Sequence, residues 1–188
     1  MSNPSAKGSL PGWRFWLPLL LQLGIVVLIP ARQALTLATG TTIYLQTAPV
    51  DPYDLLRGRY VTLAYALDRR SALEELPGWS PELLSTPGIL YLRLAPPEPE
   101  EDPTQPWRAV GVSRDRPKDL TPEEKVLQGW FNGWRLEFGI EEFFIPEAIG
   151  DALEEDIRRH PEATRAEVKV DPWGKAALVG LWVEGRRY

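Results

Sequence analysis

An uncharged apolar run near the N-terminus is the feature that most constrains what this chain can fold into. Residues 15–31 read FWLPLLLQLGIVVLIPA, and Gln22 is the only strongly polar residue among them. As a helix rising about 1.5 Å per residue, the run covers about 25 Å, slightly less than the roughly 30 Å hydrocarbon core of a bilayer. Continuation to residue 37, with the Arg32 guanidinium reaching toward an interface, closes this gap. We therefore predict a transmembrane anchor over residues 15–37.

Two other interpretations of this run remain. A buried core helix is usually amphipathic or shorter, whereas this run is apolar all round. A cleaved secretory signal is the stronger alternative, because Lys7 and Arg14 supply a positive N-terminal region and residues 36–38 (TLA) offer a small-residue cleavage site. The length of the run favours an uncleaved anchor.

The charges that flank the run predict its orientation. Lys7, Arg14 and the terminal amine precede it, whereas only Arg32 follows it closely. Because positive charge is enriched on the cytoplasmic side of membrane helices, we expect residues 1–14 to be a cytoplasmic tail. Residues 38–188 then form a single extracytoplasmic domain.

Composition excludes several classes of function. The net charge is −5 and the basic residues do not cluster, which argues against nucleic-acid binding. The chain has no cysteine, so disulfides, thiol catalysis and thiolate metal sites are excluded. Because it also shows no phosphate loop, metal-ligand spacing or dinucleotide fingerprint, we expect no cofactor and no metal.

Short runs rich in β-branched and aromatic residues, separated by turn residues, follow the apolar run. This pattern is typical of an antiparallel β domain, and we predict a mainly β (α+β) fold, a small sheet or barrel-like domain with one or two short helices. The candidate strands are residues 42–47, 60–67, 89–94, 107–112, 126–131, 134–138, 166–170 and 176–183.

Local signals predict two hairpins and three helical segments. Asn132-Gly133 favours a tight turn with positive φ, and residues 171–174 (DPWG) favour a type I turn that ends in Gly. Capping boxes at Ser71/Glu74 and Thr121/Glu124 each predict a short helix, and a longer helix is expected over residues 146–160.

A polar segment, residues 51–65 (DPYDLLRGRYVTLAY), is the first candidate site. Pro52 and Gly58 favour a turn that leads into a strand, in which Val61, Leu63 and Tyr65 share one face. Turn-and-core architecture competes with a binding role, which loops on rigid sheets often have. The candidate binding residues are Asp51, Asp54, Arg57, Gly58, Arg59, Tyr60 and Tyr65.

Residues 138–147 (FGIEEFFIPE) are the second candidate segment. Three carboxylates lie close together in sequence, but acid–base or metal chemistry requires them to converge in a cleft. We therefore interpret them as a solvated acidic edge, and we expect the apolar residues 143–145 to be buried against the sheet. The residues concerned are Glu141, Glu142, Phe144 and Glu147.

The two segments together resemble the bacterial family named GDYXXLXY after its core motif. Gly58, Tyr60, Leu63 and Tyr65 match the motif in register, whereas Arg59 stands where the family name has Asp. The order of features is also similar: an N-terminal span, a strand at residues 39–47, the second segment and a terminal hairpin. The resemblance implies a membrane-anchored protein without established activity, and a partner among the multi-pass membrane proteins that are sometimes encoded beside such proteins.

Three functions fit these observations to different degrees. A non-enzymatic, membrane-tethered module that binds an integral membrane protein requires nothing that the sequence lacks. A membrane-bound hydrolase needs a serine nucleophile and a buried lysine base, and Lys169 alternates away from its apolar neighbours Val168 and Val170. A small-ligand or ion sensor remains an alternative, because many pockets leave no linear signal.

An exposed apolar patch would favour the partner-binding hypothesis over the other two. The sequence contains eight tryptophans, enough to form such a patch in a domain of this size. Trp79, Trp107 and Trp173 lie near predicted turns, and we expect these three to be exposed.

Overall fold

The computed structural model describes residues 13–48, 60–98, 102–145 and 147–188. The chain divides into two compact units, Met1–Leu35 and Thr36–Tyr188. Strand residues outnumber helical ones, so the predicted mainly β fold with an N-terminal apolar helix is confirmed.

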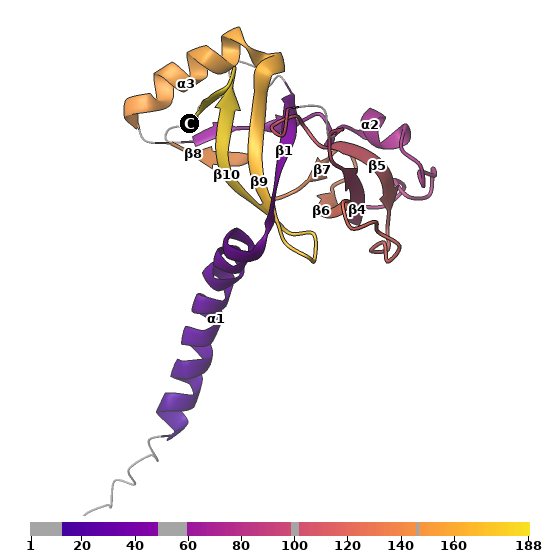
Figure 1. The fold of residues 1–188 in the computed structure, drawn as a ribbon. Coiled ribbons are helices and arrows are strands. Elements are labelled where there is room, and N and C mark those ends of the chain that lie inside the picture. The colour runs from indigo at the N-terminus through magenta and orange to yellow at the C-terminus, as the bar shows by residue number, and fades with distance from the viewer. Residues whose placement is uncertain (1–12, 49–59, 99–101, 146) are drawn as a thin grey trace, which may run out of the picture. The chain divides into compact units, whose positions relative to one another are not determined.

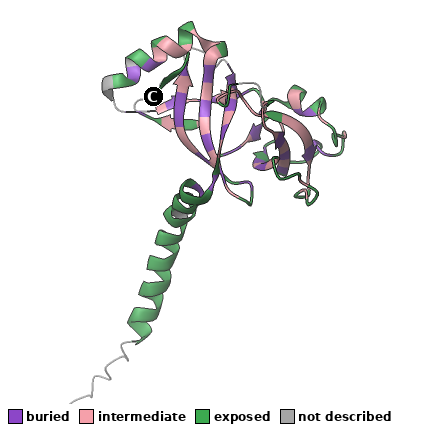
Figure 2. Cartoon of the chain, in the orientation of Figure 1, coloured by how far each residue is buried: buried purple, intermediate pink, exposed green. Residues whose placement is uncertain are grey.

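Helix α1 (Trp13–Thr39) contains the whole apolar run. The helix continues through Pro30 and extends to Thr39, beyond residue 37, where the predicted anchor ends. It is long and apolar enough to cross a membrane, and none of its most apolar window is buried (Figure 2). Lipid is the solvent in which such a surface is favourable.

The first sheet of the domain is antiparallel and has the order β11-β10-β9-β1-β3 (Figure 1). Its strands are β1 (Thr41–Ala48), β3 (Ala64–Tyr65), β9 (Thr164–Val170), β10 (Ala176–Val183) and β11 (Arg186–Arg187). The β9–β10 turn confirms the predicted hairpin: the Asp171 carboxylate accepts bonds from the Trp173 and Lys175 main-chain N–H groups, and Gly174 has φ 91°.

The strand predicted over residues 60–67 is divided in the structure. Its first part is β2 (Tyr60–Thr62), which pairs with β8 (Glu142–Phe144), whereas its second part is β3, which pairs with β1. The prediction of a single longer strand was therefore wrong, because the two parts find partners in different sheets. Side chains nevertheless alternate as expected, and Val61, Leu63 and Tyr65 are all buried.

The second sheet has the order β5-β4-β6-β7 and is also antiparallel. Its strands are β4 (Gly88–Ala95), β5 (Arg108–Ser113), β6 (Lys125–Phe131) and β7 (Leu136–Glu137). The predicted hairpin forms, but Gly133 alone of the Asn132-Gly133 pair has positive φ. Trp134 and Arg135 are part of the turn, which makes β7 shorter than the predicted strand at residues 134–138.

Of the three predicted helical segments, two form helices and one forms a turn. Helix α2 (Arg70–Glu74) begins before Ser71 and has no side-chain cap, because Glu74 pairs with Arg70 instead. Thr121 and Glu124 do form a bond between the Thr121 N–H and the Glu124 carboxylate, but this closes a turn before β6, not a helix. Helix α3 (Glu147–Arg159) matches the predicted long helix and is followed by the 3-10 helix η1 (Pro161–Ala163).

One hydrophobic core extends through the domain and joins the sheets. Its completely buried members include Ile43 and Leu45 of β1, Leu90 and Leu92 of β4, and Leu153 of α3. Burial of each such side chain contributes about 1.5–3 kcal/mol. The core therefore holds the sheets and α3 in place around the divided strand β2–β3.

Candidate functional site

The first motif joins two sheets. Tyr60 opens β2, which pairs with β8, and Tyr65 ends β3, opposite Thr47 of β1. Leu63 lies between the two strands, and its N–H donates a 2.7 Å hydrogen bond to the carbonyl of Glu141. The motif thus forms the connection along which the chain passes from one sheet to the other.

The second segment is the partner of the first. Tyr65 donates a 2.7 Å hydrogen bond from its hydroxyl to the main-chain carbonyl of Ile140. Its ring also packs edge-on against Phe138, with the ring centroids 5.9 Å apart. Two segments that the sequence presents as separate motifs are therefore a single structural unit.

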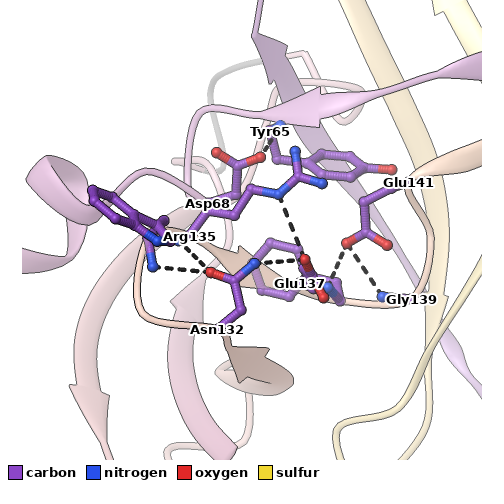
Figure 3. A network of polar contacts seen from close by, with 9 residues as sticks. Tyr65, Asp68, Asn132, Arg135, Glu137, Gly139 and Glu141 are labelled. Carbon is purple, nitrogen blue, oxygen red and sulfur yellow. Dashed lines mark hydrogen bonds and ion pairs between the residues drawn. The ribbon is translucent and has the colours of Figure 1, made fainter. Parts of the chain in front are cut away.

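Asp68 supports the end of this unit (Figure 3). Its carboxylate accepts a 3.1 Å bond from the Tyr65 N–H, and its main-chain carbonyl accepts a 2.9 Å bond from the Leu136 N–H of β7. Burial raises the pKa of the Asp68 carboxyl, while the Tyr65 N–H bond and the charges of Arg135 and Arg69 oppose this shift. Burial likewise raises the pKa of Tyr65 well above 10, and the negative charges of Glu141 and Asp68 raise it further.

Glu141 stabilises the turn that precedes β8 (Figure 3). One oxygen of its carboxylate accepts hydrogen bonds from the main-chain N–H groups of Phe138 and Gly139, and Gly139 has φ 77°. The interpretation as a solvated acidic edge was therefore wrong for Glu141. Glu142 is exposed on β8, and the side chain of Glu147 lies outside the described residues.

Most of the polar residues predicted to bind in the first motif cannot be placed in the fold. Five of the predicted binding residues lie outside the described residues: Asp51, Asp54, Arg57, Gly58 and Arg59. Tyr60 is described, and its ring lies 5.8 Å from that of Phe144. Phe144 is 69% exposed, so the prediction that it is buried against the sheet was wrong, whereas Ile145 is buried as expected.

An open groove of about 390 Å³ lies beside the two motifs. Phe138, Gly139 and Glu141 of the second segment form part of it, residues of the second sheet form another part, and Lys175 of the β9–β10 turn completes it. Ile89 of β4 and Trp130 of β6 are cross-strand partners on that face, 41% and 51% exposed. We call this feature the aromatic groove; it is also lined by Gln128, Gly129, Glu137 and Lys175.

The charged side chains of the aromatic groove differ in their hydrogen bonds and ion pairs with the rest of the chain. Glu137 accepts a 2.7 Å bond from the Asn132 amide and lies 3.7 Å from the Arg135 guanidinium, and Glu141 is bonded as described above (Figure 3). The Lys175 ammonium has no hydrogen bond or ion pair with the part of the chain that the structure describes. The groove therefore combines an apolar surface with the Lys175 ammonium, which no described residue binds.

The aromatic groove was not predicted from the sequence, although one signal was present. In β6, Phe131 is buried, so alternation places Trp130 on the opposite face together with Gln128. Of the tryptophans predicted to be exposed, Trp79 and Trp173 are exposed, whereas Trp107 is partly buried against the core. Trp134, at 85% exposure, was missed.

Within the described residues, no group of three or more His, Asp or Glu side chains is arranged to hold a metal ion. The polar contacts of the unit formed by the two motifs are mainly bonds to the main chain, which hold loops in place.

Comparison with known proteins gives one match. The family model described as GDYXXLXY protein matches residues 22–181, which include both motifs and most of the strands. No curated protein matches the chain, and no solved structure does. Because the match covers most of the chain, from the apolar helix to the final hairpin, the chain belongs to the GDYXXLXY family.

Proposed function

We propose that this chain is a membrane-anchored, non-enzymatic protein whose β-rich domain binds an integral membrane protein through the aromatic groove. The observation that supports binding is that Ile89 and Trp130 are exposed side by side on neighbouring strands. Tryptophan is enriched at protein interfaces, where a large side chain excludes water at little cost in conformational entropy.

The apolar surface of α1 supports the choice of partner. None of the most apolar window of this helix is buried, so a bilayer is the environment that would solvate it. A domain tethered in this way meets other membrane proteins at high effective concentration. Lys7 and Arg14, which precede the apolar run at residues 15–31, favour a cytoplasmic N-terminus and an extracytoplasmic domain.

The chemistry of the aromatic groove suggests what the partner presents. An apolar side chain would lie against Ile89 and Trp130, where it would replace water on both surfaces. An acidic group beside that side chain would pair with Lys175, because the carboxylates of Glu137 and Glu141 already have donors. The groove volume of about 390 Å³ is sufficient for a short segment of polypeptide.

A pair of tryptophan substitutions tests the proposal. The full-length protein is extracted from its own membranes in a mild detergent, and proteins that remain bound in stoichiometric amount are identified. Trp130→Ser is expected to lose an integral membrane partner that the unmodified protein retains. Trp134→Ser is the matched control, because Trp134 is more exposed but does not line the aromatic groove.

Two results would contradict the proposal. One is a protein that elutes alone and monomeric under all mild detergent conditions. The other is equal loss of the partner in Trp130→Ser and Trp134→Ser, which would indicate that the groove has no specific role. Lys175→Glu adds a charge test, since it should weaken retention of a partner with an acidic contact.

A further inference from the structure

The apolar run of helix α1 contains one side-chain amide. Gln22 is the only strongly polar residue between residues 15 and 31, and its side chain is exposed. The part of the chain that the structure describes offers this side chain no hydrogen-bond partner. In hydrocarbon, water cannot supply the missing bonds, so donors and acceptors on another polypeptide would stabilise the amide.

A second amide lies on the same side of the helix. Gln33 follows Gln22 by eleven residues, and its side chain is also exposed. At about 100° per residue, the two side chains point in directions that differ by about 20°. Leu19 and Val26 lie on this amide stripe, whereas Leu20 and Val27 lie on the opposite side of the helix. Both amides can therefore face the same neighbouring helix.

We infer that the amide stripe pairs with the same stripe of a second copy of this chain, which makes the protein a parallel dimer within the membrane. This inference rests on the proposed membrane anchor. A carboxamide contains both a donor and an acceptor, so Gln22 is complementary to Gln22 of another copy across a two-fold axis. Two copies inserted in the same orientation bring these residues to the same depth.

The composition of the apolar run at residues 15–31 favours a second copy of this chain over a charged partner. Residues 15–31 contain no Asp, Glu, Lys or Arg that could neutralise a charge on a foreign helix. Amide bonds between helices are the kind of polar contact that stabilises membrane helix pairs. The dimer would also present two β-rich domains, and so two aromatic grooves, to a partner assembly.

Single cysteines provide the test, because the chain has no cysteine of its own. The full-length variants Leu19→Cys, Val26→Cys, Leu20→Cys and Val27→Cys are oxidised mildly in native membranes. We expect disulfide-linked dimers of this chain at positions 19 and 26, and little product at positions 20 and 27. Equal cross-linking at all four positions would overturn the inference, as would a product whose mass requires a different protein.

A second set of variants tests the amide itself. In the Val26→Cys background, Gln22→Leu should lower the yield of dimer by roughly three- to tenfold, the effect expected when an interhelical hydrogen bond is lost. Gln22→Asn, which keeps the carboxamide, should retain more dimer than Gln22→Leu. An unchanged yield in Gln22→Leu would contradict the role of the amide.

Alkaline carbonate extraction separates this inference from the proposed function. If the unmodified protein stays in the membrane pellet but the Leu19→Cys and Val26→Cys variants do not cross-link, the dimer is wrong and the anchor stands. If the protein leaves the membrane with peripheral proteins, the anchor is wrong and the dimer fails with it.

Discussion

The hydroxyl of Tyr65 donates a 2.7 Å hydrogen bond to the main-chain carbonyl of Ile140, 75 residues further along the chain. This bond joins the last residue of the first motif to the turn of the second. Together with the bond from the Leu63 N–H to the Glu141 carbonyl, it fixes the place where the chain passes between the sheets. A change in either motif should therefore affect the other.

Removal of the Tyr65 hydroxyl should destabilise the domain. In Tyr65→Phe the buried ring remains, but the Ile140 carbonyl loses its donor, which we expect to lower the free energy of unfolding by about 1–2 kcal/mol. The measurement is urea unfolding of the full-length protein in detergent, followed by tryptophan fluorescence. Tyr91→Phe is the control, because the Tyr91 hydroxyl has no hydrogen bond to any described residue. Equal effects of the two substitutions would contradict a specific role for the Tyr65 bond.

Asp68 should make stability depend on pH in the acid range. Burial raises the pKa of this carboxyl in the folded protein above its ordinary value of 3.8, so the folded state binds the proton more tightly than the unfolded state. The contribution of Asp68 to stability is then present at low pH and is lost as the pH rises through the folded pKa. Asp68→Asn, which cannot ionise, should gain stability relative to the unmodified protein as the pH rises from 3 to 7.

Other carboxylates change stability with pH in the opposite direction. The effect of Asp68 is therefore measured as the difference in stability between Asp68→Asn and the unmodified protein at each pH. Burial raises the pKa of Glu167, but the hydrogen bonds from Trp182 and Arg187 outweigh it and leave the pKa below its ordinary value. Such a group stabilises the fold above its unfolded pKa and loses this effect in acid. Parallel pH curves for Asp68→Asn and the unmodified protein would show that Asp68 has an ordinary pKa.

Gly129 should not tolerate a side chain. A Cβ atom at this position would lie 2.7 Å from the Cγ and Cδ1 atoms of Leu136, which is buried. We expect Gly129→Ala to lower the free energy of unfolding by about 1–3 kcal/mol, because the core must shift to accept it. Gly111→Ala is the matched control in the same sheet, since its Cβ would make only ordinary contacts at 3.5 Å or more. A neutral Gly129→Ala would show that Leu136 repacks freely.

The orientation of the chain can be read from two engineered thiols. A membrane-impermeant maleimide applied to intact cells should label Glu123→Cys, an exposed position in the domain, and should not label Ser5→Cys in the N-terminal tail. Both positions should react once the cells are broken. The reverse pattern would place the domain in the cytoplasm and contradict the charge rule on which the orientation rests.

Elements whose signals are local were predicted well. The apolar run became α1, and the strands at residues 42–47, 89–94, 126–131 and 176–183 were found within two residues of their bounds. The turn at Asp171 formed as expected, because its carboxylate bonds to N–H groups of its own loop. Alternation also identified the buried face that carries Val61, Leu63 and Tyr65. The family was recognised from its motifs and is confirmed.

The sequence by itself determined the anchor candidate, the β-rich class and most strands, because these depend on hydrophobicity and spacing between near neighbours. Only the tertiary structure decided that residues 60–65 divide between two sheets, that Tyr65 reaches Ile140, and that Ile89 and Trp130 remain exposed beside Glu141. These features depend on which strands pair. Which strands pair depends on segments that lie far apart in the chain, so the pairing cannot be predicted from the pattern of a single segment.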